Sequence, residues 1–303
     1  MANSLILVLV FHFVSVSFLS CEFQELNFQI QKANEITVLA LDVSRTATGM
    51  VDCASQCALR KNECFNFIFD DSNQQCILAF IEVGSDTTLN LNSPNVYRSC
   101  KDVTDTTQPR QLVKLTSGLV VMCDTQTDGG GWTIFQRRVS GAIGFNRNWT
   151  EYRNGFGDYG VGDFYLGNEN IHCISSKASH ELRIDMEYKG ISYYALYSFF
   201  KLFSEEDGYR LSVSGFGGNV SDDSLSFKSN YQQFSTYDRD NDIDFFRHCA
   251  NRYKSGWWFS FCHDVNLNGI WGSKTLGESI EWLSITGEWD SLEFTEMKIR
   301  PLH

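Results

Sequence analysis

The sequence predicts an α+β protein in two parts, a small disulfide-stapled domain followed by a larger domain built on antiparallel strands. The first part is indicated by four cysteines that lie close together between residues 53 and 76. The second is indicated by apolar and polar residues that alternate with the period of a strand after residue 118. A chain of 303 residues is also longer than one typical domain, which favours two.

Residues 1–20 have the character of a secretory signal peptide. The apolar run LILVLVFHFVSVSFL is short for a membrane span and small residues follow it, so cleavage is expected after Ser17 or Ser20. A second run of about twenty apolar residues is absent from the sequence. We therefore expect a secreted, extracellular protein without a membrane span, whose ten cysteines form disulfides in an oxidising compartment.

Further features bear on export, on partners and on oligomerisation. The sequons at Asn148 and Asn219 are candidate glycosylation sites. The formal net charge of −12 argues against nucleic-acid partners, because phosphates require a basic surface. Neither a heptad run nor a Gly-x-y repeat provides an oligomerising stalk, although the sequence is compatible with an oligomer.

Residues 21–100 are expected to form the first domain. Cys53 and Cys57 are four residues apart and would share one face of a helix, and the alternating phenylalanines that follow Cys64 indicate a strand. A turn-rich stretch then leads to Cys76, so a helix and a hairpin would be stapled by two bridges. A zinc site made of the four thiolates is the alternative, which an oxidising compartment disfavours.

This order of elements resembles the PAN/apple domain, in which two helix cysteines are tied to the neighbouring sheet. Apple domains also often join their two ends. The resemblance therefore implies three disulfides, Cys53–Cys76, Cys57–Cys64 and, between the two ends of the domain, Cys21–Cys100.

The second domain is expected to span residues 118–303, after a linker at residues 101–117 that is rich in threonine and aspartate. The apolar run up to Cys123 and the run that starts at Trp132 both indicate strands, separated by a turn with three glycines. A phosphate-binding loop is excluded there, since neither a lysine nor a helix start follows. Residues 181–202 break once into two neighbouring antiparallel strands, and FTEMKIRP is a final strand.

Four carboxylates stand at alternate positions in one short stretch: Asp238, Asp240, Asp242 and Asp244. In an extended backbone they would repel one another on a single face. A bent loop around a hard cation removes that conflict, and oxygen-only ligands suit calcium better than zinc. An EF-hand is excluded, because the sixth position is Ile243 rather than glycine and the twelfth is Cys249 rather than glutamate. A solvated acidic loop is the alternative.

Four phrases of the sequence resemble the fibrinogen-related family: GGGWTIFQRR, NGFGDYGVGDFYLGNENIH, FSTYDRDND and the WW…CH…NLNG run. The resemblance extends from about Cys100 to His303. It implies a globe like those of the fibrinogen carboxy-terminal regions, ficolins and tachylectins, with a central antiparallel sheet, short helices and a binding face built from long loops. It also implies non-enzymatic recognition, commonly of acetylated sugars and in some members of peptides.

Carried over by position, the resemblance implies calcium as the cofactor. Asp240 and Asp242 would be the carboxylate ligands, with backbone carbonyls near Asp244 and Phe246. Asp238 and Asp244 remain further carboxylate candidates. The stretch from Asp242 to the next cysteine is one residue longer than is usual in the family, which changes the carbonyls that reach the ion.

The resemblance also implies a ligand pocket beside a disulfide between Cys249 and Cys262. The peptide bond from Phe261 to Cys262 would be cis, and Tyr253 and His263 would line the pocket. Such a site suits an acetamido group, since an aromatic wall accepts the methyl and polar donors reach the carbonyl. The family's second aromatic wall is replaced here by TGEWDSLEF, and would be rebuilt around a tryptophan, Trp271 or Trp289.

Cys173 is not a usual cysteine of the family, and two pairings are open. Cys123 could pair with Cys173 if Cys100 closes the first domain. Otherwise Cys100 pairs with Cys123, which leaves Cys21 and Cys173 free, joined to each other or linked to another chain.

The function that these features favour is that of a secreted lectin-like pattern-recognition protein, which binds acetylated or other glycans and acts in innate immunity. The alternative is an adhesion or structural module that binds a peptide or protein in the same pocket. An enzyme is disfavoured, since the sequence contains neither a nucleophile elbow nor an H-E-x-x-H arrangement. Trp257 and Trp258 are more typical of a packed core than of ligand contacts.

Overall fold

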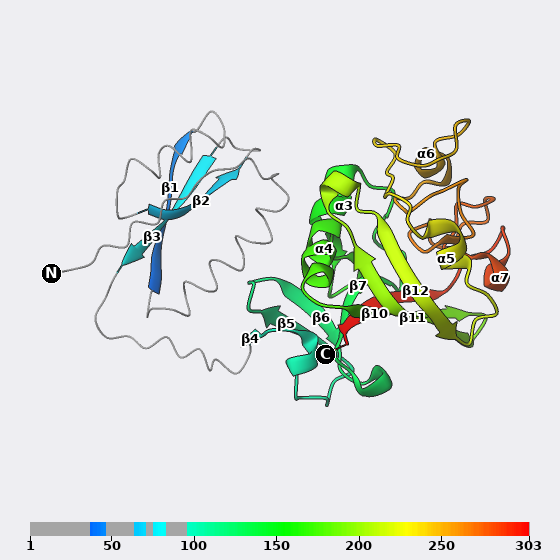
Figure 1. The fold of residues 1–303 in the computed structure, drawn as a ribbon, viewed down its shortest axis with the longest axis horizontal. Coiled ribbons are helices and arrows are strands. Elements are labelled where there is room, and N and C mark those ends of the chain that lie inside the picture. The colour runs from blue at the N-terminus through cyan, green and yellow to red at the C-terminus, as the bar shows by residue number, and fades with distance from the viewer. Residues whose placement is uncertain (1–36, 47–63, 71–74, 83–95, 303) are drawn as a thin grey trace. The chain divides into compact units, whose positions relative to one another are not determined.

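The computed structural model describes residues 37–46, 64–70, 75–82 and 96–302, and the chain divides into two compact units near residue 95 (Figure 1). The expected signal peptide and the expected helix with its two cysteines lie outside the described residues. The disulfides expected within the first domain involve cysteines whose side chains are likewise not described. No helix within the described ranges is long and apolar enough to span a membrane.

The smaller unit contains a three-stranded antiparallel sheet in the order β1-β3-β2. Its strands are β1 (Thr37–Thr46), β2 (Cys64–Asp70) and β3 (Gln75–Glu82). Strands β2 and β3 form the hairpin expected from the alternating phenylalanines. Strand β1 pairs with the free edge of β3, and the sequence pattern did not reveal it.

The larger unit is built on a ten-stranded, mainly antiparallel sheet whose main path is β12-β11-β10-β15-β7-β6-β5-β4. Strands β8 and β9 pair with each other, and β9 also pairs with β7. The strands are β4 (Val96–Tyr97), β5 (Arg110–Leu115), β6 (Val120–Asp124), β7 (Trp132–Arg138), β8 (Phe156–Asp158), β9 (Asp163–Tyr165), β10 (His180–Tyr188), β11 (Ile191–Leu202), β12 (Leu211–Gly218) and β15 (Phe294–Pro301).

Short helices and a loop-rich segment accompany this sheet (Figure 1). The helices are η1 (Cys100–Asp102), η2 (Thr127–Gly129), α3 (Trp149–Asn154), α4 (Asn168–Ser176), η3 (Glu205–Asp207), α5 (Ser224–Ser229), α6 (Cys249–Tyr253) and α7 (Leu283–Thr286). A separate two-stranded sheet joins β13 (Val265–Asn266) to β14 (Glu281–Trp282). The long loops that the family resemblance implies lie on either side of β13 and β14.

The strand pair predicted for residues 181–202 is confirmed as the hairpin β10–β11. Tyr188 pairs directly with Ile191, so the turn has only two residues. Lys189 and Gly190 both have positive φ, 50° and 73°, which matches the twist that a two-residue hairpin turn requires. Alternate residues of β10 are buried, which is the pattern of a strand with one face on the core.

The linker expected at residues 101–117 is wrong, because β5 lies within it and is hydrogen-bonded to β6. Only Val113 and Leu115 of this strand are buried, while Leu112 is 54% exposed. Of the four residues that are not buried, Arg110, Gln111 and Lys114 are polar. This short and mostly polar strand therefore has the composition of a linker.

Cys100 is bonded to Cys123, so the expected Cys21–Cys100 bond is wrong. This disulfide ties η1 to β6 inside the larger unit, which requires Cys100 to belong to that unit rather than to close the first domain. Cys173 on α4 is also disulfide-bonded. Its pairing with Cys123, one of the open alternatives, is excluded because Cys123 is already used.

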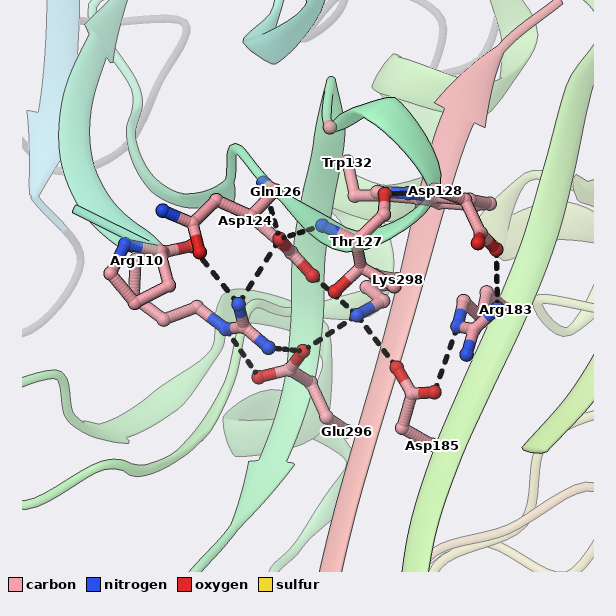
Figure 2. Close-up of polar contacts among 12 residues, drawn as sticks. Arg110, Asp124, Gln126, Thr127, Asp128, Trp132, Arg183, Asp185, Glu296 and Lys298 are labelled. Atoms are coloured by element: carbon pink, nitrogen blue, oxygen red, sulfur yellow. Dashed lines mark hydrogen bonds and ion pairs between the residues drawn. The ribbon is translucent and has the colours of Figure 1, made fainter. Parts of the chain in front are cut away.

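A buried network of charges joins strands β5, β6, β10 and β15 of the large sheet (Figure 2). The ammonium group of Lys298 on β15 is inaccessible and lies 2.5 Å from Asp124 Oδ2, 2.6 Å from Asp185 Oδ2 and 3.0 Å from Glu296 Oε1. Arg110 on β5 bridges the same group, 2.7 Å from Glu296 Oε1 and 3.1 Å from Asp124 Oδ1. A buried ammonium requires such partners, because isolated burial of a charge is costly.

The network predicts loss of stability in acid. Burial by itself would raise the pKa of the Asp124 carboxyl, but the charge and hydrogen bond of Lys298 outweigh it and lower that pKa to about 2. The pKa of Glu296 is also lowered, since Lys298 and Arg110 prevail over burial. A carboxyl with a depressed pKa in the folded state stabilises the protein above its unfolded pKa of about 4 and loses that contribution as the pH falls.

We therefore expect the free energy of unfolding to drop by about 2 kcal/mol from Asp124 alone as the pH is lowered from about 5 to 2. Urea unfolding at a series of pH values measures this. Lys298→Met is the informative comparison, because its unfolding free energy should depend less on pH over that interval. An identical pH dependence in both proteins would contradict the assignment to this network.

Candidate functional site

The aspartate loop does not use its four carboxylates in the same way. Asp238 Oδ1 accepts hydrogen bonds from the backbone N–H of Trp149, at 2.9 Å, and from Thr236 Oγ1, at 2.7 Å. Trp149 is the first residue of α3, so Asp238 fastens the loop to the start of that helix. This carboxylate therefore has a structural role, and it is the weakest of the four candidates for a metal ligand.

Asp240 and Asp242 form a close pair of carboxylates. Asp242 accepts backbone hydrogen bonds from Asp244 N, at 2.9 Å, and from Cys249 N, at 2.8 Å. Asp240 Oδ1 accepts one from Asp242 N at 3.3 Å. Burial, together with the neighbouring Asp240 carboxyl, raises the pKa of Asp242 to about 6. Two like charges held this close disfavour each other, and a cation or a proton relieves the repulsion.

The other residues expected near the ion are arranged differently. The carboxylate of Asp244 is buried, where it accepts a hydrogen bond from Phe246 N at 3.1 Å and one from Arg247 Nε at 2.9 Å. Its Oδ2 also lies 3.9 Å from Cys262 Sγ. Phe246 projects its ring into solvent, with 92% of the residue exposed.

Within the described part of the chain, one group of three residues has metal-ligand spacing: Asp244, Cys249 and Cys262. The two cysteines are bonded to each other, with their Cα atoms 5.3 Å apart. A disulfide offers no thiolate, so this group is not a zinc-type site. The bond is the pairing that the family resemblance implies, and it joins the start of α6 to the turn after Ser260.

The cis peptide expected between Phe261 and Cys262 is wrong, since no cis bond occurs in the described ranges. Cys262 has φ 56° instead, and Ser260 N donates to Cys262 O at 3.0 Å. The chain reverses through this left-handed residue, a conformation that a non-glycine residue adopts only where the surroundings hold it. Phe261, at the tip of the turn, is 55% exposed.

Tyr253 and His263 are brought together, with ring centroids 4.6 Å apart and the rings edge to face. The imidazole is not open to solvent, since the His263 side chain is 3% exposed. Its Nε2 lies 2.5 Å from Glu281 Oε1, and the Glu281 side chain is 4% exposed. Glu281 was not among the site residues predicted from the sequence, although a glutamate between Ile280 and Trp282 is a signal of a buried, paired carboxylate.

The aromatic surroundings differ from expectation in one respect. Trp271 packs on Gly141, where an added Cβ would lie 2.4 Å from the indole Cγ. Trp289 is 60% exposed. The described contacts of Tyr253 instead include Gly277, where an added Cβ would lie 2.4 Å from the Tyr253 ring. The surface next to Tyr253 is therefore backbone of the 277 turn, and neither tryptophan is placed there by these contacts.

Trp257 and Trp258 are both fully buried, which confirms the core interpretation. Trp257 Nε1 donates to Ser229 Oγ at 3.2 Å, and Trp258 Nε1 donates to Tyr209 O at 2.8 Å. The two indoles are packed edge to face with centroids 5.0 Å apart. The backbone of Trp257 also pairs with that of Ser235, just before the aspartate loop.

Both sequon asparagines use their side chains in local structure. Asn148 Oδ1 caps α3 by accepting from Glu151 N at 2.8 Å. Asn219 Oδ1 accepts from Tyr194 N at 2.6 Å, and its Nδ2 donates to Ser192 O at 3.2 Å.

Comparison with known proteins decides the family. Residues 96–302 match the family model described as the C-terminal globular domain of fibrinogen beta and gamma chains. The chain belongs to this family. Among relatives, Ryncolin-4 of Cerberus rynchops is 38% identical over 222 residues, which cover 69% of this chain and 62% of that protein. The human fibrinogen C domain-containing protein 1 is 43% identical over 195 residues, 61% of this chain and 41% of the relative.

Solved structures agree with the fold of the fibrinogen C-terminal domain. The fibrinogen-like globe of human ANGPTL6 aligns with a TM-score of 0.64 at 34% identity, and covers 68% of this chain and 96% of that one. A lamprey fibrin D-dimer complexed with the peptide Gly-His-Arg-Pro-amide aligns with a TM-score of 0.61 at 32% identity, over 73% of this chain and 78% of the other. The chain spans less than two thirds of the length of each of the two relatives named above, so the match concerns the fibrinogen C-terminal domain rather than the whole relatives.

Proposed function

We propose that the chain is a secreted, lectin-like recognition protein that binds acetylated glycans, with calcium holding its aspartate loop. The observation that carries the proposal is the disulfide between Cys249 and Cys262, whose Cα atoms lie 5.3 Å apart. Asp242 accepts the N–H of Cys249, while Phe261 and His263 flank Cys262. The aspartate loop is therefore linked, through Cys249 and the disulfide, to the turn that carries Phe261 and His263.

Asp240 and Asp242 are the residues that would hold calcium. Their carboxyls lie close enough for Asp240 to help raise the pKa of Asp242. Two carboxylates this close, of which Asp242 is half-buried and Asp240 exposed, are unfavourable without a counter-charge, and a hard divalent cation with oxygen ligands supplies that charge. Backbone carbonyls near Asp244 and Phe246 would complete the ligand set.

Recognition would fall to the surface around Tyr253 and Phe261. Tyr253 is partly exposed, and Phe261 is 55% exposed at the tip of its turn. Aromatic rings of this kind bind the methyl of an acetyl group or the apolar face of a sugar ring. The partner class is therefore glycans, and N-acetylated glycans in particular, with innate pattern recognition as the biological setting. Glycosylation at Asn148 and Asn219 and an apple-like first domain belong to the same proposal of an exported protein.

One comparison favours a second candidate, capture of a peptide in the same site. The lamprey fibrin structure, similar in fold to this domain, holds a four-residue peptide amide. The same aromatic and polar surface could take a peptide end, which would make the chain an adhesion or structural module.

The proposal predicts that Tyr253→Ala weakens binding of N-acetylated oligosaccharides by about 10-fold or more, because it removes the aromatic surface against which the ligand packs. Biolayer interferometry in calcium, and again in chelator, measures this. Phe227→Ala, which truncates an aromatic residue that is 80% exposed on α5, is the control and should bind as the parent does.

Two results would count against the proposal. Folded protein that shows no calcium-dependent binding to any acetylated glycan contradicts it. Binding of the peptide Gly-His-Arg-Pro-amide that is lost in Tyr253→Ala, without any glycan binding, establishes the second candidate instead.

A further inference from the structure

One ring nitrogen of His263 has a hydrogen-bond partner and the other has none. Nε2 lies 2.5 Å from Glu281 Oε1, whereas Nδ1 is buried and unpaired. The surroundings of the imidazole are largely aromatic, with the Tyr253 ring at 4.6 Å and the Phe259 ring at 5.5 Å between centroids. Buried polar atoms nearly always have partners, so an unpaired nitrogen in such a place points to a group that is absent from the free protein.

Glu281 decides which of the two nitrogens carries the proton. An ionised carboxylate only accepts hydrogen bonds, so in a neutral imidazole the nitrogen that faces it is the one that carries the proton. Nδ1 is then left with a lone pair and can only accept. Glu281 is itself well held, because it pairs with Asn266 between β14 and β13, and its Oε2 accepts from Ser279 Oγ at 3.4 Å.

We propose that Glu281 is a positioning residue, which keeps His263 in the Nε2–H tautomer so that Nδ1 accepts a hydrogen bond from the bound ligand. The ligand class that fits carries an N–H donor next to a small apolar group, as an acetamido group does. An acetate ester has the same methyl and carbonyl but no such N–H. The inference rests on the proposed function, since it assigns a part of the ligand to the same site.

The geometry also says what binding requires. Nδ1 is shielded, and the partly exposed Tyr253 ring stands edge-on to the imidazole. A ligand therefore reaches Nδ1 only after a side chain moves, and we assign that movement to the partly exposed Tyr253 ring. A ligand with an N–H satisfies the lone pair of Nδ1, whereas an ester leaves it unpaired, and sites built to bond a donor reject analogues that lack it.

The tautomer is tested without any ligand. Long-range ¹H–¹⁵N NMR on the full chain, labelled at histidine, distinguishes protonated from unprotonated ring nitrogens, and His263→Gln assigns the signals. We expect a protonated Nε2 and an unprotonated Nδ1 at pH 8. In Glu281→Gln the amide can offer either an oxygen or an NH₂ group to Nε2, so a mixture of tautomers is expected. A wild-type His263 protonated at Nδ1, or a tautomer unchanged in Glu281→Gln, overturns the proposal.

Ligand preference is the second readout. The affinities for N-acetylglucosamine and for 2-O-acetylglucose are measured by calorimetry in calcium, and the ratio is compared between variants. The wild type should prefer the amide by about 10-fold, and Glu281→Gln should reduce that ratio to about 2-fold or less. Glu278→Gln, the same change three residues away at a side chain that contacts Arg252, is the matched control and should keep the ratio.

The two readouts separate this inference from the proposed function. If neither sugar binds the wild type, the proposed function fails, and the NMR experiment still decides the role of Glu281. If both sugars bind but the ratio is the same in all three proteins, the positioning role is contradicted while the lectin function stands. A uniform loss of both affinities in Glu281→Gln, with the ratio kept, likewise contradicts the positioning role, because a merely structural defect does not distinguish the two ligands.

Discussion

Replacement of Lys298 by methionine is expected to lower the free energy of unfolding of the fibrinogen-like unit by about 3 to 5 kcal/mol. The ammonium group is fully buried against Asp124, Asp185 and Glu296, at 2.5 to 3.0 Å. Methionine preserves the length of the side chain but removes the charge, so buried carboxylates lose their counter-ion. Chemical denaturation followed by tryptophan fluorescence measures the change.

The matched control is Lys114→Met on strand β5 of the same sheet, where the side chain is exposed. This substitution should change the unfolding free energy by less than about 0.5 kcal/mol. A similar loss of unfolding free energy in both variants would show that the buried network does not stabilise the fold more than an exposed lysine does. Restoration of stability by a second change of Asp124 to Asn would support the network directly, because it removes a carboxylate that Lys298→Met leaves uncompensated.

Replacement of Asp242 by asparagine is expected to abolish the stabilisation of the chain by calcium. An ion that binds only the folded state stabilises it by about 4 kcal/mol at a concentration a thousand times its dissociation constant. Asparagine removes one of two close carboxylates and retains one oxygen, which can accept from only one of the two N–H groups, of Asp244 and Cys249, that Asp242 binds. The variant should therefore be less stable than the parent even in chelator, and should gain nothing from calcium.

Thermal unfolding of both proteins in millimolar calcium and in chelator measures this difference. Asp207→Asn, at an aspartate on η3 that is paired with Arg210, is the control and should respond to calcium as the parent does. A melting temperature of the parent that is the same with and without calcium would contradict the assignment of Asp240 and Asp242 to the ion.

The parts of the fold that the sequence predicted correctly are those with a strong local period. The alternation in β10 and β11 indicated strands because one face of each is more buried than the other. The phrase FTEMKIRP was also predicted as a strand, although residues 295–299 of β15 are all buried. Strand β5 was missed because it buries only two of its six residues. Its stability comes from pairing with β6 and from the ion pair of Arg110 with Glu296, which is 186 residues away in sequence.

The candidate site shows the same division between local and distant information. The alternating aspartates are a local feature, and they indicated a cluster of carboxylates in this loop. The Cys249–Cys262 bond was predicted from the family resemblance, and the structure contains it. The partner of His263 could not be read in this way, since Glu281 lies 18 residues away and reaches the imidazole only because β13 pairs with β14. The role of Asp238 depends on Trp149, 89 residues earlier. Contacts of this kind follow from tertiary packing rather than from a pattern.

A crystal structure of the chain with calcium and N-acetylglucosamine tests the central claim most directly. The account predicts an ion between the carboxylates of Asp240 and Asp242. It also predicts that the acetamido methyl packs on Tyr253 and that its N–H lies within about 3 Å of His263 Nδ1. An ion bound elsewhere, or a sugar bound away from Tyr253 and His263, would contradict the account.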